Sequence, residues 1–404
     1  MNDILFLAHR IPYPPNRGDK IRSWRLLSHL GRMARVHLAC FADDEADAAH
    51  LAALRAAMGG RLGEAHVEVR RVSKAAAGAR ALIEDRPVSL TLFDSPKLRA
   101  FVDHLLAGGR IGTIFAFSGQ MAQFVPPRPA QRFVMDLADV DSAKFAQYAE
   151  EGGGPMRWVH RREAAKLFAF ERATAARADV TTFVSEAEAG LFRRRTGLPN
   201  IQALGNGVDL DFFDPAARFD RLDPALRGEG PLILFTGQMD YAPNVDAVAW
   251  FAGAVLPRLP NARFVIAGRD PTEAVRRLAG DRVQVTGSVP DMRSWLAAAD
   301  VVVAPLRIAR GIQNKVLEAM AMARPVVASP AAFEGIEAEP GFDLLVADGA
   351  PATAAAVDRL LASPDEAAAL GRAARARMQA GYSWERRLAP LAAIVDPSRR
   401  KAAA

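Results

Sequence analysis

The chain has 404 residues, of which 50% are hydrophobic and 24% are charged, and its formal net charge is +6. This length exceeds one ordinary hydrophobic core, so we expect two domains, and the composition is typical of a soluble globular protein. No apolar run reaches the ~18 residues of a membrane helix, and the apolar stretch near the N-terminus is too short for a secretory signal. The single cysteine, Cys40, excludes an internal disulfide and favours a reducing, cytoplasmic location.

The positive charge favours acidic partners such as nucleotide or lipid phosphates, although an Arg- and Ala-rich composition explains it equally well. The sequence contains no aromatic RNA-binding signature and no zinc finger. We therefore expect no nucleic-acid partner.

The first half of the chain predicts short apolar strands separated by helices. Helical patterns cover residues 20–31, 45–57 and 95–107. The predicted strands are 4–9, 36–41, 66–72, 113–118, 132–138 and 180–185. Continuous apolar strands that alternate with helices are typical of a parallel sheet covered on both faces.

The same pattern restarts after a polar stretch that contains Pro and Gly. The predicted strands of this second half are 232–237, 263–268, 283–289, 301–306 and 325–330, each followed by a helix candidate. The sequence thus predicts an α/β protein with two Rossmann-like parallel-sheet domains facing a central cleft. We expect an N-terminal domain at 1–215, a linker at 216–230 and a C-terminal domain at 231–382. A final helix and tail at 383–404 are expected to pack back toward the N-terminal domain.

The loop after the first strand could bind an anion. Gly18 lies among Pro, Asn and Gly residues just before a helix, where backbone N–H groups can approach a phosphate. Arg17 and Lys20 would add positive charge. The structural alternative is an ordinary strand-to-helix turn capped by Asp19, since Asp is a good N-cap.

The segment after the strand at 301–306 carries the strongest signal for a binding site. It places Arg307, Arg310 and Gly311 ahead of a helix predicted to begin near Gly311, where exposed amides favour a phosphate. Positions 311, 314, 315 and 318 follow the helical repeat and share one face. The polar residues on this face are Asn314, Lys315 and Glu318. The structural alternative is a surface helix edge with a pair between a cation and the glutamate.

Two further loops place a glycine directly after an apolar strand, where a ligand can approach the backbone closely. These loops carry the candidate residues Gly237, Gln238 and Met239, and Gly287 and Val289. By contrast, the NGVD sequence at 206–209 is expected to form a turn with Asn or Gly at positive φ, which is a structural role.

Several familiar signatures are absent, including a P-loop, an H-E-x-x-H zinc motif and a dinucleotide-binding G-x-G-x-x-G. Asp139 and Asp141 form a D-x-D after a strand, which could hold a divalent ion on a diphosphate or serve a turn or helix cap. We favour no metal site. The basic helix at 157–178 has an apolar face that serves either packing or a membrane surface, and packing is favoured.

The order and spacing of these pieces resemble the group 1 class of retaining, nucleotide-sugar-dependent glycosyltransferases. The resemblance covers nearly the whole chain. It rests on the loop at Gly18, on SEAE before NGVD, and on FTGQMDYAPNVDAVAWF, FVIAG, VTGSVPDM, VVVAPLR and GIQNKVLEAMAMARPVV. Within the class, DLADVDSAKFAQYA and GQMDYAPNVDAV resemble sugar transferases associated with exopolysaccharide systems.

The resemblance implies a GT-B fold whose C-terminal domain holds a UDP- or GDP-sugar and whose N-terminal domain faces the acceptor. The class signature is two glutamates eight positions apart. Glu318 matches the second, which is expected to bind the ribose hydroxyls, whereas Arg310 stands in place of the first. Two cations usual in the class are also replaced here, by Gln238 and Asn244.

The resemblance further implies retention of the anomeric configuration, no cofactor and no metal. Because positive charge is lost at 238 and 244 and gained at Arg307, Arg310 and Lys315, we expect this last segment to stabilise the departing nucleoside diphosphate. The implied acceptor is a glycan or polyprenyl-linked glycan. The enzyme would then contact the inner face of the cytoplasmic membrane peripherally.

Three other functions remain open on the sequence. A nucleotide-sugar epimerase on the same architecture would act on the donor without an acceptor. A catalytically inactive binding protein would bind nucleotide without turnover, and Arg310 in place of glutamate supports it. A metal-dependent transferase using Asp139 and Asp141 would be sensitive to chelation.

Overall fold

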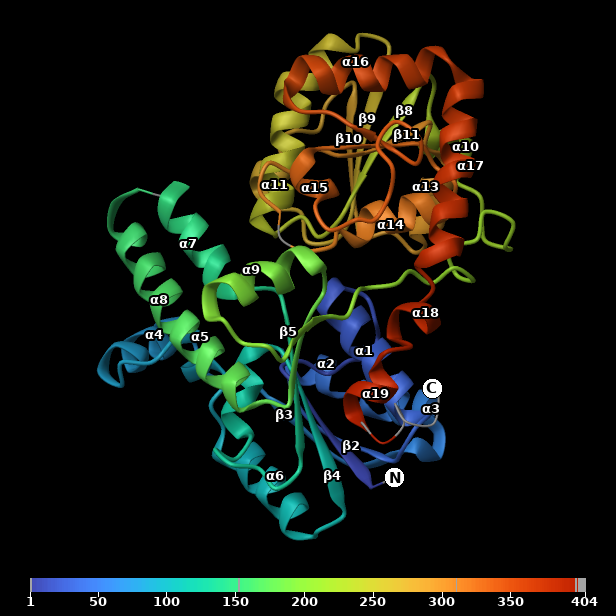
Figure 1. Cartoon of the computed structure of the whole chain (residues 1–404). Coiled ribbons are helices and arrows are strands. Elements are labelled where there is room, and N and C mark those ends of the chain that lie inside the picture. The colour runs from blue at the N-terminus through green and yellow to red at the C-terminus, as the bar shows by residue number, and fades with distance from the viewer. Residues whose placement is uncertain (1, 152, 310, 397, 399–404) are drawn as a thin grey trace. The chain divides into compact units, whose positions relative to one another are not determined.

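A computed structural model describes residues 2–151, 153–309, 311–396 and 398, and the chain divides into two compact units (Figure 1). The N-terminal unit comprises Met1–Gly205 and Leu388–Ala404, and the C-terminal unit comprises Asn206–Arg387. The division thus falls before the residue 215 expected from the sequence. The reason is that Val208 joins the second unit, where its N–H donates to the Tyr382 carbonyl at 2.8 Å.

The N-terminal unit is built on a seven-stranded parallel sheet in the order β3-β2-β1-β4-β5-β6-β7. The strands are β1 (Asp3–Ala8), β2 (Val36–Ala42), β3 (Leu62–Val69), β4 (Ile111–Phe117), β5 (Arg132–Ala138), β6 (Val180–Phe183) and β7 (Ile201–Ala203). β2 is buried along its whole length, as a strand covered on both faces must be. β7 was not predicted, because three residues are too few to show a period.

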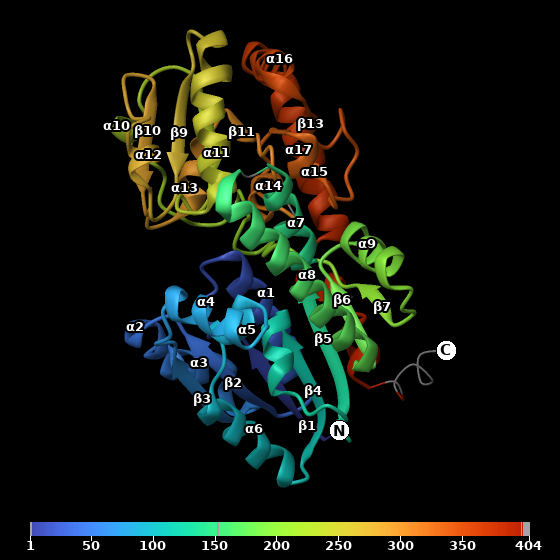
Figure 2. The same cartoon turned by 90° about the vertical axis from the view of Figure 1, so that its left-hand side faces the viewer.

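Helices pack on both faces of this sheet (Figure 2). They are α1 (Gly18–Gly31), α2 (Glu45–Ala48), α3 (Leu51–Met58), α4 (Lys74–Ile83), α5 (Val88–Leu92), α6 (Pro96–Ala107), α7 (Asp141–Glu151), α8 (Gly154–Arg177), α9 (Glu186–Thr196) and α19 (Leu391–Val395). The helix predicted at 45–57 is divided into α2 and α3.

The C-terminal unit has a six-stranded parallel sheet in the order β10-β9-β8-β11-β12-β13. The strands are β8 (Leu232–Thr236), β9 (Arg263–Ala267), β10 (Val283–Gly287), β11 (Val301–Ala304), β12 (Val326–Ala328) and β13 (Leu345–Val346). The helices are α10 (Pro224–Arg227), α11 (Ala242–Trp250), α12 (Glu273–Arg276), α13 (Met292–Ala298), α14 (Asn314–Ala321), α15 (Pro330–Phe333), α16 (Gly349–Ala362), α17 (Pro364–Gly381) and α18 (Trp384–Leu388).

Both sheets have the strand order of a Rossmann fold, so the predicted α/β class with two Rossmann-like domains is confirmed. In each sheet the chain leaves the first strand, β1 or β8, toward one edge and later returns to its other side. Ligands of such sheets bind beyond the carboxyl ends of the strands at this reversal. The topology therefore predicts a ligand site at the loops after β8, β9, β10 and β11 in the C-terminal unit.

The C-terminal segment differs from the single helix predicted at 383–395. Two short helices, α18 and α19, occur there because Pro390 has no N–H to continue the first. α19 packs on the sheet of the N-terminal unit. Arg132 Nε donates to the Ile394 carbonyl at 2.6 Å, and Thr113 Oγ1 donates to the Val395 carbonyl at 3.3 Å.

In the part of the chain that the structure describes, no helix is both long and apolar enough to cross a membrane.

Candidate functional site

Backbone hydrogen bonds join the loops at the carboxyl ends of β8, β9 and β10. Gly237 N donates to the Ala267 carbonyl at 3.1 Å, and Met239 N donates to the Arg269 carbonyl at 2.8 Å. Gly268 N in turn donates to the carbonyl of Gly287 at 3.1 Å. The predicted residues Gly237, Gln238, Met239 and Gly287 are thereby brought to one edge of the sheet, since their strands are neighbours.

The first two of these loops touch each other through glycines. A Cβ on Gly268 would lie 1.6 Å from the Gly237 carbonyl oxygen, so only glycine fits there. A Cβ on Gly237 would lie 2.8 Å from Asn244 Nδ2 and 3.3 Å from Lys315 Nζ. The Gly237 turn is thus packed directly against an amide and an ammonium group.

Lys315 lies at the centre of this arrangement. Its Nζ donates to Asn244 Oδ1 at 2.6 Å and lies 4.3 Å from the centre of the Phe235 ring. The Asn244 amide donates in turn to the Gln238 carbonyl at 2.8 Å. Asn244 therefore holds both the turn after β8 and the ammonium group that approaches it from α14.

The electrostatics of Lys315 are unusual for a lysine. Removal of the ammonium group from water lowers its pKa to about 7, and the Glu318 carboxylate only partly opposes this. The same loss of solvent raises the pKa of Glu318 to about 7, partly opposed by Lys315. As whole residues, Lys315 and Glu318 are partly exposed. A bound anion would favour the protonated form of Lys315.

The start of α14 differs from the sequence expectation. The helix begins at Asn314 rather than near Gly311, and Gln313 is the residue before its first turn. Gly311 has φ of 65° and cannot continue a right-handed helix, so it lies in the preceding loop. Of the four positions expected to share one helical face, only 314, 315 and 318 are in the helix. Arg310 lies outside the described residues.

The remaining candidate residues of the C-terminal unit occupy more peripheral positions. Arg307 is directed to α11, where its Nε donates to Asp246 Oδ2 at 2.9 Å. The side chain of Met239 is fully buried, so only its backbone can face a ligand. Val289 packs partly buried against the core. Asn314 Oδ1 accepts a hydrogen bond from Asn206 at 3.3 Å.

Arg269 is a site residue that the sequence analysis missed. It directly follows Gly268, and its Nη2 donates to Gln238 Oε1 at 3.2 Å. It brings a guanidinium group to the same turn as Lys315. The signal was present, because Gly268 and Arg269 follow an apolar strand as Gly237 and Gln238 do.

The NGVD segment does not form the expected turn with positive φ. Gly207 is absent from the left-handed region, and the segment instead runs beside residues 382–384. A Cβ on Gly207 would lie 2.8 Å from the Tyr382 carbonyl oxygen. The glycine is needed for close backbone packing, so its role is structural for a different reason than predicted.

The loop before α1 in the N-terminal unit uses its charges internally. α1 begins at Gly18, and the residue before it is Arg17, which has no capping side-chain bond. Asp19 is not the cap. Its carboxylate accepts from Arg10 Nη1 at 2.7 Å and pairs with Arg17 Nε at 2.9 Å. Burial alone would raise the pKa of Asp19, but the hydrogen bond to His9 and the two arginines hold it well below its usual range.

The cations at the start of α1 are likewise paired with acids of the same unit. Lys20 is buried and pairs with Asp47. Arg22 forms a buried ion pair with Asp136, with Nη2 to Oδ2 at 2.6 Å. The structure therefore directs the charge of Lys20 toward an aspartate rather than toward a phosphate.

The D-x-D residues Asp139 and Asp141 lie in different surroundings. In the described part of the chain no group of three or more His, Cys, Asp or Glu side chains could hold a metal ion. Asp141 begins α7 and pairs with Lys144 at 2.9 Å. Burial, together with the nearby carboxylates of Glu188 and Asp141, raises the pKa of Asp139 to about 7. A proton on Asp139 therefore stabilises this group of acids near neutral pH.

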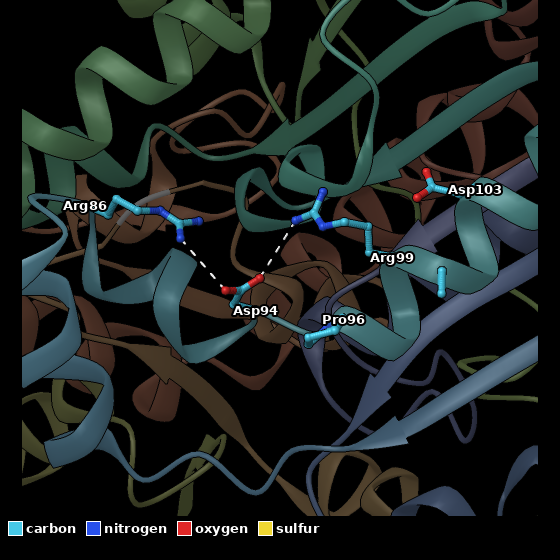
Figure 3. A pocket seen from close by; sticks show the side chains of 6 residues that line it. Arg86, Asp94, Pro96, Arg99 and Asp103 are labelled. Atoms are coloured by element: carbon cyan, nitrogen blue, oxygen red, sulfur yellow. Dashed lines mark ion pairs between the residues drawn. The ribbon is translucent and has the colours of Figure 1, made fainter.

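A surface pocket of about 480 Å³ lies elsewhere on the N-terminal unit (Figure 3). Its lining residues are Arg86, Asp94, Pro96, Arg99, Ala100 and Asp103. Asp94 lies between the two arginines, 3.9 Å from Arg86 Nη1 and 3.8 Å from Arg99 Nη2. Since two cations face two carboxylates, the lining offers no excess charge for a diphosphate.

Comparison with known proteins shows what these features are similar to. Residues 230–363, which include the β8 turn, Arg269 and α14, match the family described as Glycosyl transferases group 1. The fold is GT-B. Sucrose-phosphate synthase from Thermosynechococcus elongatus superposes with a TM-score of 0.72 at 18% identity over 100% of both chains. HepE from Anabaena, solved in complex with UDP and glucose, gives a TM-score of 0.64 at 15% identity, again over 100% of both chains.

A relative by sequence is the GDP-mannose-dependent alpha-(1-6)-phosphatidylinositol monomannoside mannosyltransferase of Mycobacterium tuberculosis. It is 31% identical over 233 residues. The match covers 53% of this chain and 60% of that protein. The similarity therefore spans less than two thirds of the relative's length.

Proposed function

We propose that the chain is a glycosyltransferase that moves a hexosyl unit from a UDP- or GDP-sugar to a hydroxyl group of a glycan or lipid-linked glycan. The observation that carries this proposal is the contact of Lys315 with Asn244 beside the Gly237 turn, with Glu318 one helical turn further on. The Mycobacterium tuberculosis relative is named for GDP-mannose, and the HepE structure contains UDP and glucose. Both support a nucleoside-diphosphate-sugar donor.

The donor diphosphate would bind at the turn after β8. Lys315 uses one of its three N–H donors on Asn244, so others can reach phosphate oxygens. Arg269 approaches the same turn through Gln238 and adds a second cation. Arg307 contributes less in this proposal, because Asp246 already engages its guanidinium group. Glu318 would accept hydrogen bonds from the ribose hydroxyls.

Transfer with retention follows from the resemblance to the retaining class. The bond between the anomeric carbon and the diphosphate oxygen breaks, and the acceptor oxygen bonds to that carbon on the same face. The acceptor proton passes to the departing phosphate oxygen, so the step requires no protein base. The cations at the β8 turn stabilise the negative charge that develops on the leaving group.

The proposed acceptor is a lipid-linked glycan. The exopolysaccharide resemblance of DLADVDSAKFAQYA and GQMDYAPNVDAV favours a polyprenyl-linked glycan. The Mycobacterium tuberculosis relative is named for a phosphatidylinositol mannoside acceptor, which is also a lipid. A lipid acceptor of either kind supports our proposal that the enzyme acts at the inner face of the cytoplasmic membrane.

The test is thermal stabilisation of the purified chain by UDP, GDP, ADP and CMP, each with and without EDTA, followed by incubation with the matching sugar nucleotide. A ligand at 100 times its dissociation constant adds about 2.7 kcal/mol to the free energy of unfolding. Stabilisation by UDP or GDP that survives EDTA, with sugar transfer to a lipid-linked glycan, supports the proposal.

Other outcomes point to other functions. Loss of stabilisation in EDTA would indicate a metal-dependent transferase that uses Asp139 and Asp141. Conversion of the donor sugar to an epimer without acceptor would indicate an epimerase. Binding without turnover on any acceptor tried would indicate a catalytically inactive nucleotide-sugar-binding protein.

A further inference from the structure

The exposed large apolar side chains of the N-terminal unit are gathered in one region. Among its described residues, those with high exposure lie only in α4, in the loop just before it, and in the first two turns of α8. They are Val72, Leu82, Ile83, Met156, Trp158 and Val159. Ile83 is 86% exposed and Trp158 is 61% exposed. We call Leu82, Ile83, Met156, Trp158 and Val159 the α4–α8 surface.

The two helices that carry this surface are in direct contact. Arg162 Nη2 of α8 donates to the Ala81 carbonyl at 2.8 Å, and Lys166 pairs with Asp85 just after α4. Both helices are labelled in Figure 1. Leu82 follows Ala81 in the chain. Trp158 lies one helical turn before Arg162 on the same side of α8. Leu82 and Trp158 thus each lie next to, or one helical turn from, a residue of this contact.

Packing within the unit does not account for these side chains. α4 is anchored by Ala77 and Ala81, both fully buried, and by Ser73, whose Oγ accepts from Ala76 N at 3.2 Å. Its two largest apolar residues, Leu82 and Ile83, are instead directed outward. Residues 153–159 at the start of α8 are all exposed. Contiguous exposed apolar groups of this kind mark an interaction surface.

The charge around the surface is positive. Arg157 and Arg161 are exposed in the same turns of α8 as Trp158. The acids that follow α4 are compensated, since Glu84 pairs with Arg80 and Arg86, and Asp85 pairs with Lys166. Glu150, near the end of α7, is an exposed acid that precedes α8. A Trp and long aliphatic groups flanked by arginines are the residues that helices use at the interface of an anionic bilayer.

We propose that the α4–α8 surface docks on a bilayer that contains anionic phospholipid, with Trp158 and Ile83 inserted and Arg157 and Arg161 at the phosphates. The inference deepens the proposed function, because it names the surface by which the chain would reach a lipid-linked acceptor. Vesicle binding is measured without sugar transfer. A failure to bind vesicles would therefore leave the proposed donor chemistry intact. A failure to bind or transfer the donor sugar would leave the proposed membrane surface intact.

The experiment is co-sedimentation of the full chain with vesicles of phosphatidylcholine that contain one third phosphatidylglycerol, compared with pure phosphatidylcholine. One variant is Trp158→Ser with Ile83→Ser, and a second is Arg157→Glu with Arg161→Glu. The matched apolar control is Leu226→Ser with Phe342→Ser, which changes exposed side chains of the C-terminal unit. The matched charge control is Arg276→Glu with Arg372→Glu, both exposed.

We expect the wild-type chain to bind the anionic vesicles, and each α4–α8 variant to bind about ten-fold more weakly or worse. Both controls should bind like the wild type, and UDP or GDP should stabilise all five proteins equally. Brominated lipids should quench the fluorescence of Trp158, and this quenching should disappear in Trp158→Phe while binding persists.

Three results would overturn the inference. The first is absence of vesicle binding by the wild-type chain at low salt. The second is unchanged binding of the Trp158→Ser, Ile83→Ser variant, which would leave only surface electrostatics. The third is a wild-type dimer in solution that this variant converts to a monomer with no change in vesicle binding, which would assign the surface to a second copy of the chain.

Discussion

Replacing Lys315 with alanine removes the ammonium group that Asn244 holds against the Gly237 turn. A hydrogen bond between a charged donor and a phosphate contributes about 1.5–3 kcal/mol. The dissociation constant for UDP or GDP should therefore rise by about 10- to 150-fold. Because Lys315 contacts Asn244 and the Phe235 ring, the fold of Lys315→Ala is checked separately by its urea unfolding curve.

The structure also suggests a rescue of this loss. Lys315 Nζ lies 2.6 Å from Asn244 Oδ1, so a lysine at position 244 can bring its ammonium group to nearly the same place. The double variant Asn244→Lys, Lys315→Ala should recover most of the lost affinity. Arg277→Ala is the matched control, because it removes an exposed cation that directly follows α12 in the same unit.

The assay is titration calorimetry or thermal stabilisation with UDP and GDP at a pH below 7, where Lys315 is protonated. Wild-type affinity in Lys315→Ala would refute the assignment of this lysine to the diphosphate. Lost affinity in Lys315→Ala that the double variant fails to recover would attribute the effect to local packing instead of charge.

Three further predictions test the pKa values and the packing. Because the pKa of Lys315 is about 7 in the free protein, affinity for UDP or GDP should fall as pH rises from 7 to 9, by at most about ten-fold per pH unit. Titration of the affinity should show no such fall in Lys315→Arg. Gly268→Ala should cost about 1–3 kcal/mol in urea unfolding and abolish nucleotide stabilisation, whereas Gly253→Ala, whose added Cβ meets nothing within 4 Å, should do neither. Burial raises the pKa of Glu171 in the folded state to about 8, above its ordinary value of 4.5. Between these two pH values the folded state binds one proton more than the unfolded state. The free energy of unfolding should therefore decrease as pH rises from 5 to 8. Glu171→Gln should flatten that decrease in denaturation curves, and an unchanged slope would contradict the raised pKa.

Much of the fold could be predicted because strands and helices produce local patterns of apolar residues in the sequence. Continuous apolar segments such as 232–237 and 263–268 lie close to the observed strands, since a strand buried on both faces must be apolar throughout. The short strands β7 and β13 were not predicted, because two or three residues are too few to show a hydrophobic period. The start of α14 was placed three residues early, since the positive φ of Gly311 was not visible in its neighbours.

The candidate site was predictable in part. Glycines that end apolar strands marked the turns at Gly237 and Gly287. Gly237 is needed because a Cβ would lie 2.8 Å from Asn244 Nδ2, and Gly287 is favoured by its φ of 68°. The partners of the charged residues were not predictable. Lys20 and Lys315 carry the same charge at the start of helices, yet Lys20 pairs with Asp47 and Lys315 contacts Asn244.

The sequence by itself determined which segments become strands and helices and which turns can accept a ligand. Only the tertiary structure decided which cation pairs with an acid of its own unit and which lies beside a turn that can bind a phosphate. Lys315 and Asn244 are 71 positions apart, and Arg269 and Gln238 are 31 apart. Such contacts depend on the lateral order of β8, β9 and β11 in the sheet, which local periodicity does not encode.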